Sequence, residues 1–238
     1  MHVHVAFTPD ESASAPVGVV VDVLRATSTI PQALAAGYRR VLCCAEIEDA
    51  RRLRGEIEGS LVGGEREAKK IEGFDVGASP REFLEPRADT LILSTTNGTR
   101  TILRAAEQCR VVLLGSLLNL GAVADEVRAR GEDAVVFCAG FKGAFALDDA
   151  YCAGRIVALL GAERSDAAVA SELLAGSFPD AHTALLARTY GPPGLEEDIL
   201  FCSRESVLPV VPRLVGLNGP AAEIALCLFE GLNRARHC

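Results

Sequence analysis

Acidic, basic and hydroxyl side chains follow an apolar run near the start of the chain. Asp22 stands directly after residues 17–21, Arg25 comes three residues later, and Thr27 and Ser28 follow it. A carboxylate in that place can hold a cation, whereas an arginine and the free N–H groups of a helix can hold a phosphate or a carboxylate. A plain salt bridge between Asp22 and Arg25 is the alternative, and this stretch alone leaves the choice open.

A second acid–base pair, Glu65 and Arg66, follows two glycines in the segment 63–80. This segment has many glycines and charged residues and little hydrophobic periodicity, which predicts a loop. A loop of that length in a compact domain is usually functional or disordered. The pair is therefore a second candidate, with a solvated run of charges as the alternative, because further charged residues flank it.

Residues 90–106 repeat the order of the first stretch: a strand, a group of hydroxyl residues, and a helix with an arginine in its first turn. The hydroxyl and N–H groups at such a turn can bind an anion, and ordinary helix capping uses the same groups. Both roles stay open here. The candidates are Thr96, Asn97, Gly98, Thr99 and Arg100.

Asp148 lies at the start of a further predicted helix, residues 147–160. Acids are favoured in the first turn by the helix dipole alone, so a structural role is the alternative to metal binding. Together, Asp22, Glu65 and Asp148 are hard oxygen ligands with no histidine or thiolate among them. Such ligands fit Mg²⁺ rather than Zn²⁺.

Several common catalytic signatures are absent from the sequence. It has no Walker loop, no G-x-G-x-x-G after a strand, no G-x-S-x-G elbow, no Asp-x-Asp at a strand end and no thiolate phosphatase loop. The eight cysteines form no Cys-x-x-Cys pair and lie in or beside apolar runs, which predicts reduced, buried thiols and no zinc site. A water activated by a metal ion is therefore the expected attacking group.

The overall composition limits the class of partner. The 238 residues carry a net charge of −8, and no apolar run approaches the roughly 20 residues that cross a bilayer. Neither a signal peptide nor a basic stripe is visible, so we expect a cytoplasmic protein that binds neither membrane nor nucleic acid. A small acidic ligand stays suitable, because a few local arginines can outweigh the global charge.

Strands and helices must alternate to position these residues. Strands are expected at residues 2–7, 17–21, 41–44, 60–62, 90–93, 111–114 and 134–138. With helices between most of them, the pattern predicts one domain, residues 1–238, of the α/β class: a three-layer α/β/α architecture around a mostly parallel or mixed sheet. In open sheets of this kind, ligands bind at the carboxyl ends of the strands.

The ends of the helices are also predicted from the sequence. Thr27 or Ser28 is the expected N-cap of the first helix, and Gly37 its stop. After Gly161 the pattern becomes mostly helical, and residues 162–190 could form a cap or subdomain. Residues 220–236 are expected to form a terminal amphipathic helix.

Four segments in this order resemble the ComB-type 2-phosphosulfolactate phosphatases. They are residues 22–28, 64–66 with 73–77, 95–100 and 140–149, and the resemblance extends over about residues 17–211. It implies an α/β/α fold unrelated to the common phosphatase superfamilies. It also implies Mg²⁺-dependent hydrolysis of 2-phosphosulfolactate to 3-sulfolactate and phosphate. One departure is Ala78, which stands where the family is expected to have asparagine.

The first functional hypothesis is a Mg²⁺-dependent phosphatase for a small phosphorylated hydroxy acid that carries a second anionic group. Asp22, with Glu65 or Asp148, would hold the metal. Arg25, Arg66 and Arg100 would clamp the phosphate and the sulfonate or carboxylate, with Thr27, Ser28 and residues 96–99 as further substrate contacts. The alternative is a binding protein for small dianions without catalysis, with Ala78 as a sign of lost activity. Either protein could form a homo-oligomer.

Overall fold

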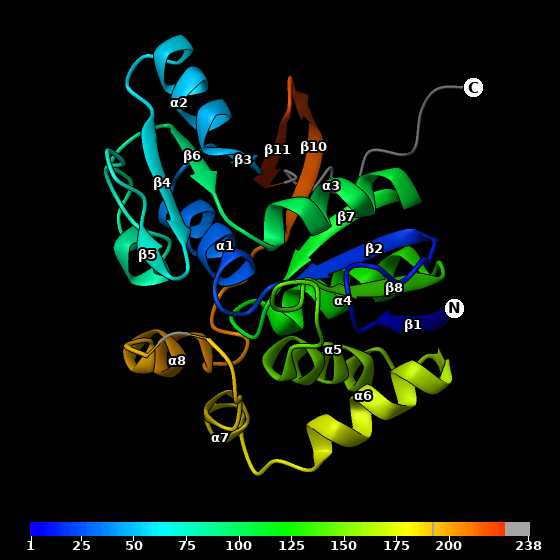
Figure 1. Ribbon diagram of the computed structural model, residues 1–238. Coiled ribbons are helices and arrows are strands. Elements are labelled where there is room, and N and C mark those ends of the chain that lie inside the picture. The colour runs from blue at the N-terminus through cyan, green and yellow to red at the C-terminus, as the bar shows by residue number, and fades with distance from the viewer. Residues whose placement is uncertain (192, 227–238) are drawn as a thin grey trace, which may run out of the picture.

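A single mixed sheet runs through the protein, with helices on both faces (Figure 1). The computed structural model describes residues 1–191 and 193–226. The strands are β1 (His2–Ala6), β2 (Ala15–Val21), β3 (Arg40–Cys44), β4 (Leu61–Arg66), β5 (Lys69–Lys70), β6 (Thr90–Ser94), β7 (Cys109–Gly115), β8 (Ala134–Cys138), β9 (Glu163–Arg164), β10 (Pro212–Asn218) and β11 (Ala221–Leu226). Their order across the sheet is β5-β4-β6-β3-β11-β10-β7-β2-β8-β1-β9.

The helices lie between the strands in the chain, as the alternating pattern predicts. They are α1 (Ala26–Ala36), α2 (Ile47–Glu56), α3 (Gly98–Gln108), α4 (Leu120–Arg130), α5 (Leu147–Leu160), α6 (Asp166–Gly176), α7 (Ala181–Leu186) and α8 (Glu196–Cys202). A 3₁₀ turn at Pro80–Phe83 adds to them. Gly37 and Gly131 end α1 and α4 in the left-handed conformation that glycine favours. Within the described chain, no helix is long and apolar enough to cross a membrane.

β2 is the buried centre of one half of the sheet. It runs parallel to both of its neighbours, β7 and β8. Val19 and Val21 pack into a cluster with α4 and α5, whereas Val20 packs into a second cluster with α1 and α3. Because alternate residues of β2 pack against opposite helical layers, both faces of the strand need apolar residues. The three-layer α/β fold is confirmed.

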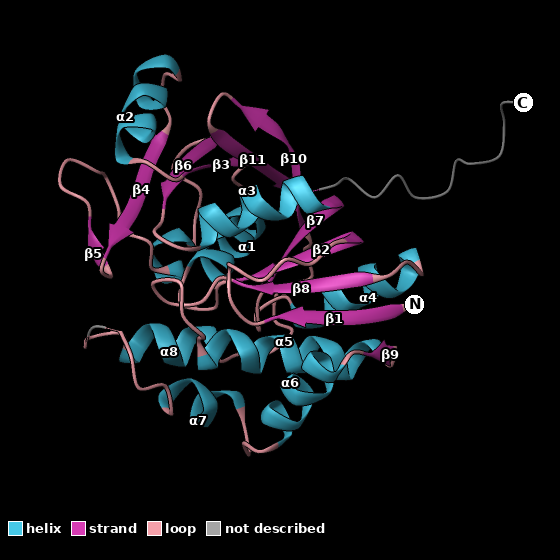
Figure 2. Cartoon of the chain, turned by 45° about the vertical axis from the view of Figure 1, so that its right-hand side comes forward, coloured by secondary structure: helices cyan, strands magenta, loops and turns pink. Residues whose placement is uncertain are grey.

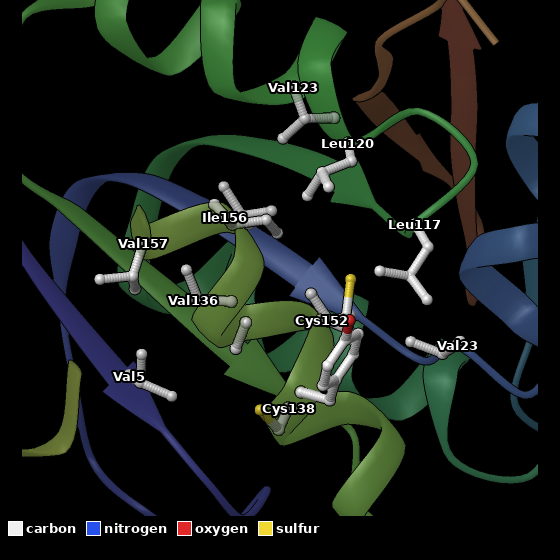
Figure 3. Close-up of a cluster of buried hydrophobic side chains, with 14 of the residues drawn as sticks. Val5, Val23, Leu117, Leu120, Val123, Val136, Cys138, Cys152, Ile156 and Val157 are labelled. Atoms are coloured by element: carbon white, nitrogen blue, oxygen red, sulfur yellow. The ribbon is translucent and has the colours of Figure 1, made fainter. Parts of the chain in front are cut away.

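The larger of these clusters joins β1, β2 and β8 to the helices after them. Figure 3 draws Val5, Val136, Ile156 and Val157 within it. Residues of α6, α7 and α8 belong to the same cluster, so the segment expected to form a cap shares its core with the sheet. The six described cysteines are free thiols, and all except Cys109 are buried.

The hairpin of β10 and β11 corrects the expectation of a terminal helix. Residues 221–226 form a strand, while residues 227–236 lie outside the described residues. Gly219 and Pro220 form the two-residue turn, with Gly219 at a φ of 58°, and glycine at the first central position is a hairpin signal. β11 pairs with β3 and β10 with β7, both antiparallel, so the hairpin joins the two parallel halves of the sheet (Figure 2).

We expect Gly154→Ala to destabilise the fold, because this glycine of α5 faces the backbone of α6, and the two helices lie side by side (Figure 1). A Cβ at position 154 would lie 2.1 Å from the carbonyl oxygen of Ser171. Overpacking of this kind costs about 1–3 kcal/mol, which lowers the melting temperature by roughly 2–12 °C. Thermal unfolding followed by circular dichroism measures the shift. Gly55→Ala is the matched control, since a Cβ there meets no atom within 4 Å; equal melting temperatures for the two variants would contradict the close contact.

Candidate active site

A cavity of about 180 Å³ opens where β2, β4, β6 and β8 end. Residues between α7 and α8 also line it. Its lining is formed by Asp22, Leu24, Arg25, Ala26, Glu65, Arg66, Glu67, Ala68, Ala78, Thr95, Thr96, Asn97, Phe141, Lys142, Arg188, Tyr190, Gly191 and Leu195. The carboxyl ends of the strands thus bring together candidates that are far apart in the sequence.

Asp22 is the buried acid of the cavity, with 8% of its surface exposed. Its Oδ1 accepts a hydrogen bond from the N–H of Ala26 (3.3 Å), and a Cβ at Gly98 would lie 2.6 Å from Oδ2. Within the described residues, no basic side chain forms an ion pair with it. Burial, together with the charges of Glu65 and Asp148, raises the pKa of Asp22 to about 7. The carboxylate therefore lacks a countercharge.

Arg25 forms its salt bridge with Asp198 and not with Asp22, so the simple Asp22–Arg25 bridge is wrong. Its Nη1 lies 2.7 Å from Asp198 Oδ2, and its Nη2 donates to the carbonyl oxygen of Ala68 (3.2 Å). Ser79 Oγ donates to the other oxygen of Asp198 (2.5 Å). Asp198 thereby fixes the guanidinium of Arg25 at the wall of the cavity.

Glu65 and Arg66 lie at the end of β4, in a hairpin with β5 that replaces the first part of the expected loop. Glu65 Oε1 accepts from the N–H and the hydroxyl of Thr96 (3.1 and 3.0 Å). Arg66 donates to two backbone carbonyl oxygens and to Ser94 Oγ (3.1 Å). In the described part of the chain, no carboxylate lies within ion-pair distance of Arg66. The hydrogen-bond acceptors of this guanidinium are therefore all neutral groups.

The turn before α3 contributes only part of the predicted substrate contacts. Thr96 and Asn97 line the cavity, and Gly98 lies against Asp22. Thr99 is buried, with its hydroxyl 3.2 Å from that of Thr95. Arg100 is not brought into the cavity: its side chain is 66% exposed and pairs with Glu46, because the third position of α3 faces solvent.

Thr27 and Ser28 lie behind the cavity and do not cap α1, which begins at Ala26. The Thr27 hydroxyl accepts from the N–H of Asp22 (2.8 Å), and Ser28 Oγ donates to the carbonyl oxygen of Val23 (2.8 Å). The carboxylate of Asp22 takes the capping role instead, since it accepts the N–H of Ala26. These hydroxyls fix the backbone that carries Asp22.

Asp148 and Asp149 are buried beneath the cavity at the start of α5. Asp148 accepts a hydrogen bond from the hydroxyl of Tyr190, and burial raises its pKa. Asp149 accepts the N–H groups of Val23 and Gly140 (both 2.9 Å), which ties the ends of β2 and β8 together. Asp148 does not line the cavity, and Tyr190 occupies one of its oxygens.

The donor set fits Mg²⁺ through Asp22 rather than through a preassembled cluster. Among the residues that the structure describes, no three histidine, cysteine or acidic side chains gather as a metal site. Asp22, Glu65 and Asp148 therefore do not form one. Mg²⁺ needs only one or two carboxylates when water and a phosphate complete its shell. A buried carboxylate without a cation, beside Glu65, meets that requirement.

Sequence reasoning missed one wall of the cavity, made by Phe141, Lys142, Arg188, Tyr190, Gly191 and Leu195. The expected helical segment extended to residue 190, whereas α7 ends at Leu186. The glycines after β8 and the Gly-Pro-Pro-Gly sequence that follows residue 190 were the available signals for a second wall. Ala78 is buried in the cavity lining, and its carbonyl oxygen accepts from Thr29 Oγ1 (2.8 Å).

The chain is similar to known proteins over almost its whole length. The family profile described as 2-phosphosulpholactate phosphatase matches residues 4–216. A protein of Carboxydothermus hydrogenoformans is 38% identical, covering 90% of this chain and 93% of its own, and one of Synechococcus is 39% identical, covering 83% and 88%. One of Clostridium acetobutylicum is 35% identical, covering 86% and 92%. Each is named "Probable 2-phosphosulfolactate phosphatase". Matches of this length and identity show that the chain belongs to the 2-phosphosulfolactate phosphatase family.

Proposed function

We propose that this chain is a Mg²⁺-dependent phosphatase that cleaves 2-phosphosulfolactate into 3-sulfolactate and phosphate. The observation that carries the proposal is the pattern of charge in the cavity. Asp22 has no cation partner and Arg66 has no carboxylate partner among the described residues, yet both line the same small space. A divalent cation and a phosphate group compensate both charges at once. The names of the relatives support the same substrate.

Arg66 is suited to hold the phosphoryl group. A guanidinium has five N–H donors in a rigid fork, and oxygens of the protein fix this one from behind. Arg25 also lines the cavity and adds a second guanidinium, held by Asp198. The first N–H groups of α3, after Asn97, favour an anion at the same place.

Asp22, with Glu65 as the second carboxylate, would hold the metal ion. When bound, Mg²⁺ supplies positive charge to the phosphoryl oxygens. Asp22 is oriented before any ligand arrives, because Ala26 donates to one oxygen and Gly98 packs against the other. A side chain larger than glycine at position 98 would push the carboxylate aside.

Water is the attacking group in this proposal. No serine, cysteine or histidine lies among the described residues that line the cavity, and the hydroxyl of Ser28 is committed to Val23. The water oxygen forms a bond to phosphorus as the ester P–O bond breaks. A phosphorylated Asp22 or Ser28, found by mass spectrometry during turnover, would replace water by a covalent route.

Phosphate release tests the proposed function directly. We expect the purified protein to release phosphate from 2-phosphosulfolactate faster than from other phosphorylated hydroxy acids, with Mg²⁺ present. EDTA should abolish the release, and added Mg²⁺ should restore it. Binding of the substrate without turnover, unchanged by EDTA, would instead identify a binding protein for small dianions.

A further inference from the structure

The cations that line the cavity fall into two kinds. Arg25 pairs with Asp198 at 2.7 Å, and Lys142 pairs with Glu67 at 3.3 Å. Arg66 and Arg188 have no carboxylate within 4.0 Å in the part of the chain that the structure describes. Two guanidinium groups without an ion pair therefore face one small cavity, and the charge of Arg188 also acts on the buried Asp148. They come from different elements, Arg66 from β4 and Arg188 from the segment after α7.

Arg188 is held in place without losing its charge. Its Nη1 donates to the carbonyl oxygen of Tyr190 (3.2 Å), the only hydrogen bond of this guanidinium within the described chain. A Cβ at Gly191 would lie 2.6 Å from the same nitrogen, and Gly191 has a φ of 91°. The glycine thus leaves room for the arginine to fold across the turn, with its remaining N–H groups unused.

Tyr190 fixes this wall at both ends of its side chain. Its ring stacks on Phe141, with 4.8 Å between the ring centroids, and its hydroxyl donates to the buried Asp148. The guanidinium of Arg188 lies 6.0 Å from the centre of the same ring. An arginine beside the ring of Tyr190, which itself stacks on Phe141, offers charge next to an apolar surface. That combination suits an acidic group carried on a short carbon chain.

We infer that Arg188 binds the second acidic group of the substrate, on the wall that Tyr190 and Phe141 hold. Arg66, at the end of β4, takes the phosphate, and Arg188 takes a sulfonate or carboxylate on the carbon skeleton. This assignment rests on the proposed function and replaces Arg100, which lies outside the cavity. Tyr190 is a positioning residue, because it acts through the orientation of Arg188.

The test compares phosphate release by the wild type and Arg188→Met from four substrates. These are 2-phosphosulfolactate, 2-phospholactate, 2-sulfoethyl phosphate and ethyl phosphate. We expect kcat/KM to fall about 10- to 100-fold on substrates with the group that Arg188 binds, as for a lost charged hydrogen bond. For ethyl phosphate, which has no second acid, kcat/KM should change less than about 3-fold. The 2-phospholactate and 2-sulfoethyl phosphate arms tell whether the group is a carboxylate or a sulfonate.

Two further variants separate binding from folding. Arg188→Lys keeps the charge and should recover part of the loss, since only the fork is missing. Arg204→Met is the matched control: Arg204 also stacks on an aromatic ring, at 3.7 Å from the centroid of Phe201, but does not line the cavity. Its kinetics should equal those of the wild type. Melting temperatures of all variants should agree, because Arg188 bonds only within its own turn.

Equal losses on all four substrates, or no loss on any, would overturn the role of Arg188. If the wild type releases no phosphate from any of them, the proposed function fails on its own. Calorimetric titration with 3-sulfolactate then decides the inference: binding by the wild type that Arg188→Met loses supports the acid site. Equal binding, or no binding by either protein, overturns it.

Discussion

Asp22→Asn is expected to lower phosphate release by about 1,000-fold, because several kcal/mol of metal-ion stabilisation are lost. The amide keeps the shape of the side chain and its contact with the N–H of Ala26, but it removes the anionic ligand. High Mg²⁺ concentrations should restore the activity only partly. Steady-state kinetics across a Mg²⁺ titration measure both effects.

The same substitution should not destabilise the metal-free protein. The pKa of Asp22 is about 7 in the folded protein and about 3.9 in an unfolded chain. Between these values the folded protein holds a proton that the unfolded chain has lost, so stability declines as the pH rises through 7. Asparagine removes that decline. In EDTA, the melting temperature of the wild type should fall from pH 6 to pH 8, whereas that of Asp22→Asn should fall less. An unstable but active variant would show that Asp22 is structural.

Arg25→Lys is the second large effect, and it should not respond to Mg²⁺. Arg25 bonds Asp198 with one nitrogen and the carbonyl oxygen of Ala68 with another, and a single ammonium cannot reproduce that fork. If the guanidinium holds the phosphoryl group in the transition state, the fall in kcat/KM corresponds to about 2–4 kcal/mol of lost transition-state stabilisation. We expect that loss to stay constant across the Mg²⁺ titration.

Arg81→Lys is the matched control for this result. Arg81 also approaches Asp198, at 4.0 Å, and pairs with Glu197, but it is exposed and lies outside the cavity. Its kcat/KM should stay within a factor of about 2, as for most surface substitutions. A similar loss in both variants would mean that the packing of the arginines around Asp198 matters, and not the contact of the Arg25 fork with the phosphoryl group.

The sequence predicts those parts of the site that directly follow a buried strand. Asp22 follows β2, Thr96 follows β6 and Arg66 ends β4, and the carboxyl ends of parallel strands meet at one edge. The hydrophobic pattern also predicts the three layers, because a strand that packs against helices on both faces is apolar at successive positions, as β2 is. It does not predict the side of α3 on which Arg100 points, because the N-terminal boundary of a helix shifts by a residue or two.

Asp198 and Arg188 could not be predicted in this way. Both lie in a segment after the parallel strands, and the partner of Asp198 is distant in sequence: Arg25 is separated from it by 173 positions. Nothing local marks such a pair. The insertion of β10 and β11 between β3 and β7 is equally non-local, because strand order depends on tertiary packing.

The place of the β10–β11 hairpin has a consequence for protein synthesis. The strands β5, β4, β6 and β3 form one hydrogen-bonded block, and β7, β2, β8, β1 and β9 form another. Among the described residues, only β10 and β11 connect the blocks by strand pairing, and the ribosome makes them after the other described strands. During translation each block can pair its own strands, but the sheet stays divided until this hairpin emerges. Until then the facing edges of β3 and β7 are open to strands of other nascent chains, as unpaired edges are.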